Sequence, residues 1–122
     1  MNKLDVTRAC EDAISLCDLA LEKPEHVPAV RGPTFLRMWG VLEPLLKDKI
    51  FEAQIKFVCG VLKTFSKDEM AEGCASAIPY STIVVLATAD GSKLTLGSES
   101  YKLIKRYLEI VRFCYEAQQA RA

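Results

Sequence analysis

Residues 80–96 read Tyr80-Ser-Thr-Ile-Val-Val-Leu-Ala-Thr88, Ala89-Asp-Gly-Ser92 and Lys93-Leu-Thr-Leu96, and this stretch decides the fold that the sequence predicts. A β-branched run, an Asp90-Gly91 turn and a second short run are together typical of a β-hairpin. A single hairpin is only marginally stable in water, so it must pack against helices or against another chain. We therefore expect one β-hairpin within an otherwise helical protein.

The register of this hairpin separates its two faces. With a two-residue loop at Asp90 and Gly91, successive side chains alternate between the faces. The face that points away from the core carries Val84 and Leu86. Either the loop at residues 24–33 covers these two side chains, or another chain contacts them. The face that should meet the core carries Ile83, Val85, Ala87, Leu94 and Leu96.

In the rest of the chain, apolar residues recur at helical spacing, which predicts α-helices. The first helix should end before Pro24, because proline disfavours helical geometry at the preceding residue. The prolines within residues 24–33 indicate an ordered or semi-extended loop. Pro44 either kinks a helix or lies in the first turn of the next one, and the strong pattern after it favours the first turn of a central helix. A capping box from Ser66 to Glu69 predicts that Ser66 caps a short fourth helix. The helical patterns run from Val6 to Leu21, from Phe35 to Leu42, from Leu46 to Phe65, from Met70 to Ala75 and from Tyr101 to Tyr115.

Composition predicts one domain in a soluble protein. Half of the 122 residues are hydrophobic, which suits one compact core over residues 1–122. Lys plus Arg and Asp plus Glu are equal at 16 each, so no net field attracts nucleic acid or an anionic membrane. The start lacks the apolar run of a signal peptide, and no stretch approaches the roughly 20 apolar residues of a membrane span. We expect an intracellular, cytoplasmic protein, with the nucleus as the open alternative.

The cysteines indicate neither a disulfide framework nor a metal site. There are five, without a C-x-x-C pair, and a reducing compartment would keep them as thiols. A zinc site needs about four Cys or His ligands, usually in close pairs, and the chain has one histidine. We expect no metal and no cofactor. The cysteines are Cys10, Cys17, Cys59, Cys74 and Cys114.

No residue pattern favours catalysis. The single histidine, His26, lies in the proline-rich loop, and nothing in the sequence brings a nucleophile such as Cys17 or Cys59 to it. The glycines stand alone or in turns, so a phosphate-binding motif is missing. We therefore name no catalytic residue and do not expect an enzyme.

Basic side chains form two candidate anion-binding surfaces. On the expected central helix, four lysines lie within about 40° of one another at about 100° per residue. Such a stripe either binds RNA, phosphate or an acidic partner, or is a solvated helix face. The first surface comprises Lys49, Lys56, Lys63 and Lys67, and the second includes Lys105 and Arg106 on the last helix.

The last helix carries an apolar stripe that is rich in tyrosine. This stripe either closes the helical bundle or pairs with its equivalent in a dimer. Phe113 falls on the polar side of the same helix, where it either packs on a loop or is an exposed contact. The candidate interface residues are Val84, Leu86, Tyr101, Tyr107 and Tyr115.

These patterns predict an α+β fold that is mainly α: a compact bundle of about five helices with one β-hairpin. The expected function is a non-enzymatic protein-interaction or self-assembly module of the adaptor, structural or viral accessory type. Its partner would be another protein or a second copy of the chain. The alternative is an RNA or anionic-ligand binding domain that uses the lysine stripe.

Overall fold

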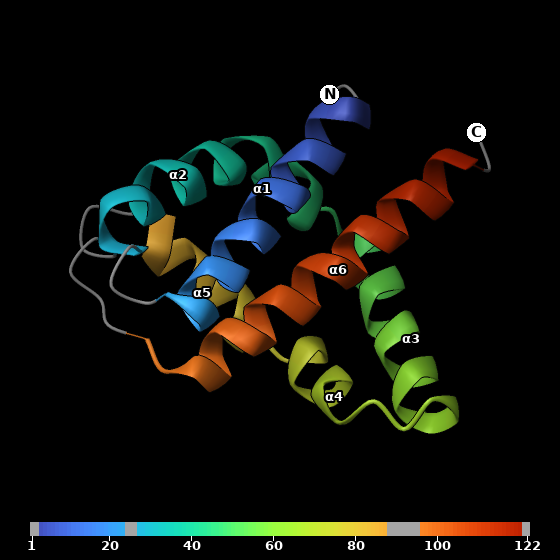
Figure 1. Cartoon of the computed structure of the whole chain (residues 1–122). Coiled ribbons are helices and arrows are strands. Elements are labelled where there is room, and N and C mark those ends of the chain that lie inside the picture. The colour runs from blue at the N-terminus through green and yellow to red at the C-terminus, as the bar shows by residue number, and fades with distance from the viewer. Residues whose placement is uncertain (1–2, 24–26, 88–95, 121–122) are drawn as a thin grey trace.

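The computed structural model describes residues 3–23, 27–87 and 96–120, which form six α-helices and no strand (Figure 1). The architecture is therefore a helical bundle, and the prediction of an α+β fold with a hairpin is wrong. The helices are α1 (Lys3–Glu22), α2 (Val27–Leu46), α3 (Lys49–Phe65), α4 (Glu69–Ala75), α5 (Ile78–Ala87) and α6 (Ser98–Ala120).

Helix α6 organises the bundle. It contacts α1, α3, α4 and α5, while α2 packs against α1 and α5. In Figure 1, α1, α2 and α5 lie on one side of α6, and α3 and α4 lie on the other. Ile104, Leu108 and Val111 of α6 are at most 1% exposed and follow one helical face. The apolar stripe of the last helix therefore closes the core of the bundle.

Residues 80–87, which are the described part of the predicted first hairpin strand, belong to helix α5. Pro79, Ile83, Leu86 and Ala87 are buried, and their spacing is that of one helical face. The β-branched residues favour a strand locally, but packing against α2 and α6 buries this face and overrides that preference. The predicted Asp90-Gly91 turn and most of the second strand lie outside the described residues.

Ser76 and Pro79 define the start of α5. The Ser76 hydroxyl accepts a hydrogen bond from the Ile78 amide at 3.2 Å, and it donates to the Gly73 carbonyl at 2.6 Å. Pro79 lies in the first turn, where a backbone amide would have no intrahelical acceptor. Within the helix, the Thr82 hydroxyl donates to the Ile78 carbonyl at 2.8 Å. Pro79 therefore marks the beginning of a helix, whereas the sequence pattern placed it at the end of one.

Helix α2 includes residues 27–33, which the sequence predicts as a loop, and it continues through Pro44. Pro44 cannot donate its backbone hydrogen bond, which normally weakens a helix interior. Met38, Leu42 and Leu46 nevertheless lie one turn apart on a buried face. Burial of these three side chains stabilises the helix across the proline. The predicted helix break at Pro44 is therefore wrong.

Two local contacts position the helices that follow. Trp39 of α2 packs edge-to-face against Tyr80 of α5, with ring centroids 5.3 Å apart, and this joins the two helices. Helix α3 begins after Asp48, whose Oδ1 accepts hydrogen bonds from the amides of Ile50 and Phe51 at 2.9 and 3.0 Å. Asp48 therefore caps the helix that carries the lysine stripe.

Helix α4 approaches α6 closely at Gly73. A Cβ added at Gly73 would lie 2.9 Å from Cδ1 of Leu103, so the missing side chain leaves room for that leucine. The neighbouring Cys74 thiol lies 3.9 Å from the Leu103 carbonyl and donates to it. The small residues of the short helix thus pack against the last helix.

Candidate functional site

An open apolar groove of about 630 Å³ lies between α3 and the C-terminal half of α6. Ile50, Phe57 and Val61 contribute to the α3 wall, and Phe113 and Ala117 contribute to the α6 wall. Both walls are regular helices whose opposite faces pack in the bundle. The groove is therefore held open by the fold itself.

Large apolar side chains on these walls are unusually exposed. Phe57 is 73% exposed, Ile50 is 72% exposed and Phe113 is 59% exposed. Phe65, one turn beyond Val61, is 80% exposed and extends the apolar surface along α3. Contiguous exposed apolar surface on a folded protein is typical of an interaction site.

Helix α3 is apolar on two sides, which explains the groove. Phe51, Ile55 and Cys59 are buried against the bundle, while Ile50 and Phe57, seven residues apart, point outward along a second line. An amphipathic helix needs an apolar arc of only about 100° to pack on a core. The excess width of the apolar arc is the sequence signal for this groove, which the prediction of a central helix does not separate from the core-facing side.

Gln54 places a polar atom among these apolar side chains. It lines the groove from α3, and its Oε1 is buried without a hydrogen-bond partner among the described residues. A buried acceptor without a donor destabilises a protein by about 1 to 3 kcal/mol. This amide is the one polar defect that we find in the walls of the groove, within the part of the chain that is described.

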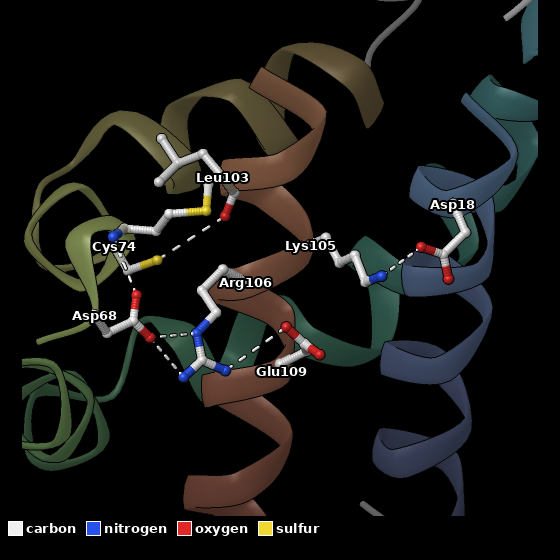
Figure 2. A network of polar contacts seen from close by, with 8 residues as sticks. Asp18, Asp68, Cys74, Leu103, Lys105, Arg106 and Glu109 are labelled. Atoms are coloured by element: carbon white, nitrogen blue, oxygen red, sulfur yellow. Dashed lines mark hydrogen bonds and ion pairs between the residues drawn. The ribbon is translucent and has the colours of Figure 1, made fainter. Parts of the chain in front are cut away.

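The second predicted basic surface is committed to contacts within the bundle (Figure 2). The Arg106 Nε donates to Asp68 Oδ2 at 2.7 Å, and its Nη1 lies 3.6 Å from a Glu109 carboxylate oxygen. The other Asp68 oxygen accepts from the Met70 amide at 3.1 Å. Asp68, and not the predicted Ser66, therefore caps α4, and Arg106 ties that cap to α6.

Lys105 is similarly engaged on the other side of α6. Its ammonium donates to Asp18 of α1 at 2.5 Å, as Figure 2 shows. The hydrogen bond to Asp18 raises the pKa of Lys105. Lys105 and Arg106 thus point to different helices, and the structure does not bring them together as one anion-binding surface.

The lysine stripe on α3 lies on the surface but is partly neutralised. Lys56 Nζ lies 3.1 Å from a Glu52 oxygen, and Lys49 lies 3.9 Å from the other oxygen of the same carboxylate. Lys63 pairs with Glu72 of α4 at 3.3 Å. Lys67 lies beyond the end of α3, where its backbone has a positive φ of 54°. Three lysines of the stripe are therefore in surface ion pairs, which leaves the stripe with a modest net field.

A second cavity, of about 320 Å³, opens beside this stripe. Lys47, Lys49 and Lys56 line it together with Tyr80 and Tyr107. Three lysines at one cavity favour an anionic occupant over a neutral one. Glu52 also lines the cavity and weakens that preference.

Most of the candidate interface residues lie in the core. Leu86 is fully buried, and the three tyrosines Tyr101, Tyr107 and Tyr115 are 5 to 6% exposed. Val84 is half-buried on α5. Because these side chains offer a partner little surface, the groove between α3 and α6 is the stronger candidate site. Phe113, named from the sequence as a candidate contact, is on that groove.

The five cysteines are free and buried. Burial raises the pKa of the Cys10, Cys17 and Cys74 thiols to about 12 and that of Cys114 to about 11. Thiols with such pKa values are almost entirely protonated at neutral pH and are poor nucleophiles. No group of three or more His, Cys, Asp and Glu side chains in the described ranges could hold a metal ion. His26 lies outside those ranges.

None of the six described helices is by itself long and apolar enough to cross a membrane. Only α4 and α5 taken together reach that length and composition, and they are bent by 67° relative to one another. Comparisons with protein-family models, with curated proteins and with solved structures found no match to this chain.

Proposed function

We propose that this protein is a non-enzymatic protein-interaction module that binds a protein partner in the groove between α3 and α6. The observation that carries the proposal is the exposure of Ile50, Phe57 and Phe113 on the two walls of one apolar groove. Burial of one such side chain contributes about 1.5 to 3 kcal/mol. A partner that covers all three would gain enough to offset part of the entropic cost of association.

Contacts that hold the two wall helices in place support the same function. Asp48 caps the start of α3, and Arg106 and Lys105 fix α6 to its neighbours. A preformed site loses little conformational entropy when a partner binds. The exposed aromatic side chains also match the residue types that are enriched at interface centres.

Site-specific photo-cross-linking in cells that express the chain tests this proposal. A benzophenone amino acid is placed at position 57 in the groove, and at position 78 of α5 as a control. Ile78 is 62% exposed but does not line the groove. We expect a discrete cross-linked protein band from position 57 and none from position 78. Equal labelling at both positions, or no band from position 57, would contradict the proposal.

A second candidate function is the binding of RNA or another anionic ligand by the lysines of α3. The cavity lined by Lys47, Lys49 and Lys56 is the specific observation that favours it. Fluorescence anisotropy with a labelled single-stranded RNA, and thermal shift with pyrophosphate, would measure such binding. We expect it to weaken with salt and with Lys49→Glu plus Lys56→Glu, but not with Lys102→Glu on α6. Binding that is indifferent to the double variant would remove this candidate.

We also propose that the protein acts inside the cell, in the cytoplasm. The five free thiols support this location, because an oxidising compartment favours disulfide formation. Fractionation of expressing cells, with the nucleus as the alternative fraction, tests it.

A further inference from the structure

We infer that the occupant of the groove is a second copy of this chain, which places its own α3 against the same apolar face. This inference rests on the proposed function, because it names the partner for the same groove. The apolar face comprises Ile50, Phe57, Val61 and Phe65 of α3 and Phe113 of α6. Three of its properties support the inference: its area, its alternation of large and small side chains, and the charges beside it.

The exposed apolar area is the size that a dimer needs. Phe57, Phe65 and Phe113 are 73%, 80% and 59% exposed, and an aromatic side chain buries about 150 to 250 Å², so together they offer about 400 Å². Ile50 and Val61 raise the total to about 500 Å². A standard interface buries about 800 Å² on each partner, and just over half of that is apolar. This face can therefore supply the apolar part of a standard dimer interface.

The outward face of α3 carries both projections and recesses. Large side chains at Ile50 and Phe57 alternate with small residues at Ala53 and Gly60. Both small residues are exposed, and a Cβ added at Gly60 would meet no atom within 4 Å. In an isologous dimer each copy contributes the same patch, so the patch must be complementary to itself. A face with large and small residues in one stripe meets that requirement.

The charges beside this face favour a copy over a strongly acidic partner. The chain has 16 basic and 16 acidic residues, so two copies carry no net repulsion. Lys56 and Lys63 border the exposed side of α3, and each already pairs with a glutamate of its own chain. An acidic helix would have to compete with those glutamates for the lysines. A neutral second copy leaves the existing ion pairs in place.

Sedimentation equilibrium of the purified full chain tests the inference, with two isoleucines as a matched pair. Ile50 on α3 lines the groove, whereas Ile78 on α5 does not, and both are mostly exposed. We expect a wild-type dimer whose dissociation constant rises about a hundredfold or more with Ile50→Lys, because the substitution acts twice in an isologous interface. Ile78→Lys should change it less than about threefold, since a surface charge away from an interface contributes little.

Other results separate the inference from the proposed function. Phe57→Lys is a second groove variant, and near-ultraviolet circular dichroism shows whether each variant keeps its packed core. A wild-type chain that remains monomeric at millimolar concentration, or a dimer unaffected by both groove variants, would overturn the inference. In the cross-linking experiment, a band at twice the mass of the chain supports a second copy. A band of any other mass overturns the second copy but retains the proposed function, and no band overturns both.

Discussion

Arg106 of α6 and Asp68 at the start of α4 are joined through a single carboxylate oxygen, which lies 2.7 Å from both Nε and Nη2 of the guanidinium. The remaining oxygen of Asp68 caps α4 by accepting from the Met70 amide. One aspartate therefore orients the start of α4 and fixes it to α6. Arg106 is consequently a stabilising residue of the bundle, and its charge is not free to attract an anion.

Arg106→Met should lower the free energy of unfolding by about 1 to 3 kcal/mol, because it removes charged hydrogen bonds from a partly buried carboxylate. Denaturant unfolding followed by circular dichroism measures the change. Lys102→Met is the matched control on α6, since Lys102 pairs with Glu99 at an exposed site. The control should cost no more than about 0.5 kcal/mol. Equal effects of the two substitutions would show that the Arg106 contact is not structural.

Native thiols should react slowly with a thiol-specific reagent at neutral pH. All five cysteines are buried, and burial raises the pKa of four of them to about 11 or 12. Reaction therefore requires an opening of the bundle that exposes the sulfur. We expect complete labelling of the five thiols in denaturant and little labelling before unfolding. Rapid labelling of any thiol in the folded protein would contradict the packing described for it.

Stability should decrease as the solution becomes alkaline. A thiol with a raised pKa in the folded state disfavours the thiolate there, so its contribution to stability is complete below the unfolded pKa of 9.0. That contribution is lost as pH rises from 9.0 toward the folded pKa of about 12 for Cys10 and Cys17. Ultraviolet thiolate absorbance and far-ultraviolet circular dichroism should change together in a pH titration. Thiolate formation near pH 9 with the helices intact would be the opposite result.

Helix α5 illustrates how much of this fold the sequence could predict. The β-branched run is a local signal for a strand, but it lies within helix α5 (Ile78–Ala87), while the Asp90-Gly91 dipeptide lies outside the described residues. Ser76 and Pro79 carried the competing signal, because a serine followed by a first-turn proline is typical of a helix start. Contact with α2 and α6 decides between them, and that contact is not visible in a local pattern. The amphipathic helices at both ends of the chain were predictable, because their periodicity alone specifies them.

The groove was less predictable than the helices around it. Apolar spacing identified α3 as a core helix, but it did not reveal that Phe57 and Ile50 lie outside the contact with α6. That division depends on where α6 crosses α3, which is a tertiary property. Phe113 was the exception, because an aromatic residue on the polar side of a helix is visible from spacing alone. The sequence predicts two basic surfaces, but it does not show their ion-pair partners: Glu72 of α4 pairs with Lys63, and Asp68, the cap of α4, pairs with Arg106.

Gln54→Leu should raise the free energy of unfolding by about 1 kcal/mol, because it removes a buried acceptor without a donor and keeps a similar volume. The measurement is denaturant unfolding at low protein concentration, where association does not contribute. Gln118→Leu on the α6 side of the groove is the control, because its side chain is exposed. That variant should differ from the wild type by less than about 0.5 kcal/mol. A destabilised Gln54→Leu variant would mean that the amide is satisfied in solution.

Gly40 and Gly60 form a natural pair for separating folding from association. Both occupy exposed positions in the interior of a helix, and a Cβ at either would meet no atom within 4 Å. Alanine at either position should therefore raise the free energy of unfolding by about 0.5 to 1 kcal/mol, because glycine is a poor helix former. Thermal or denaturant unfolding of the two alanine variants checks that both gain stability by the same amount.

Glutamate at the same two positions should affect dimer formation differently. Gly60 lies on the outward face of α3 beside Phe57, so Gly60→Glu would place a charge and a long side chain in the recess of the proposed dimer. Gly40 lies on α2 and does not line the groove, so Gly40→Glu should leave the sedimentation behaviour unchanged. We expect Gly60→Glu to abolish the dimer while both variants remain folded by circular dichroism. A dimer that tolerates glutamate at position 60 would show that the two copies do not approach along α3, because a recess filled on both sides of an isologous contact cannot accept its partner.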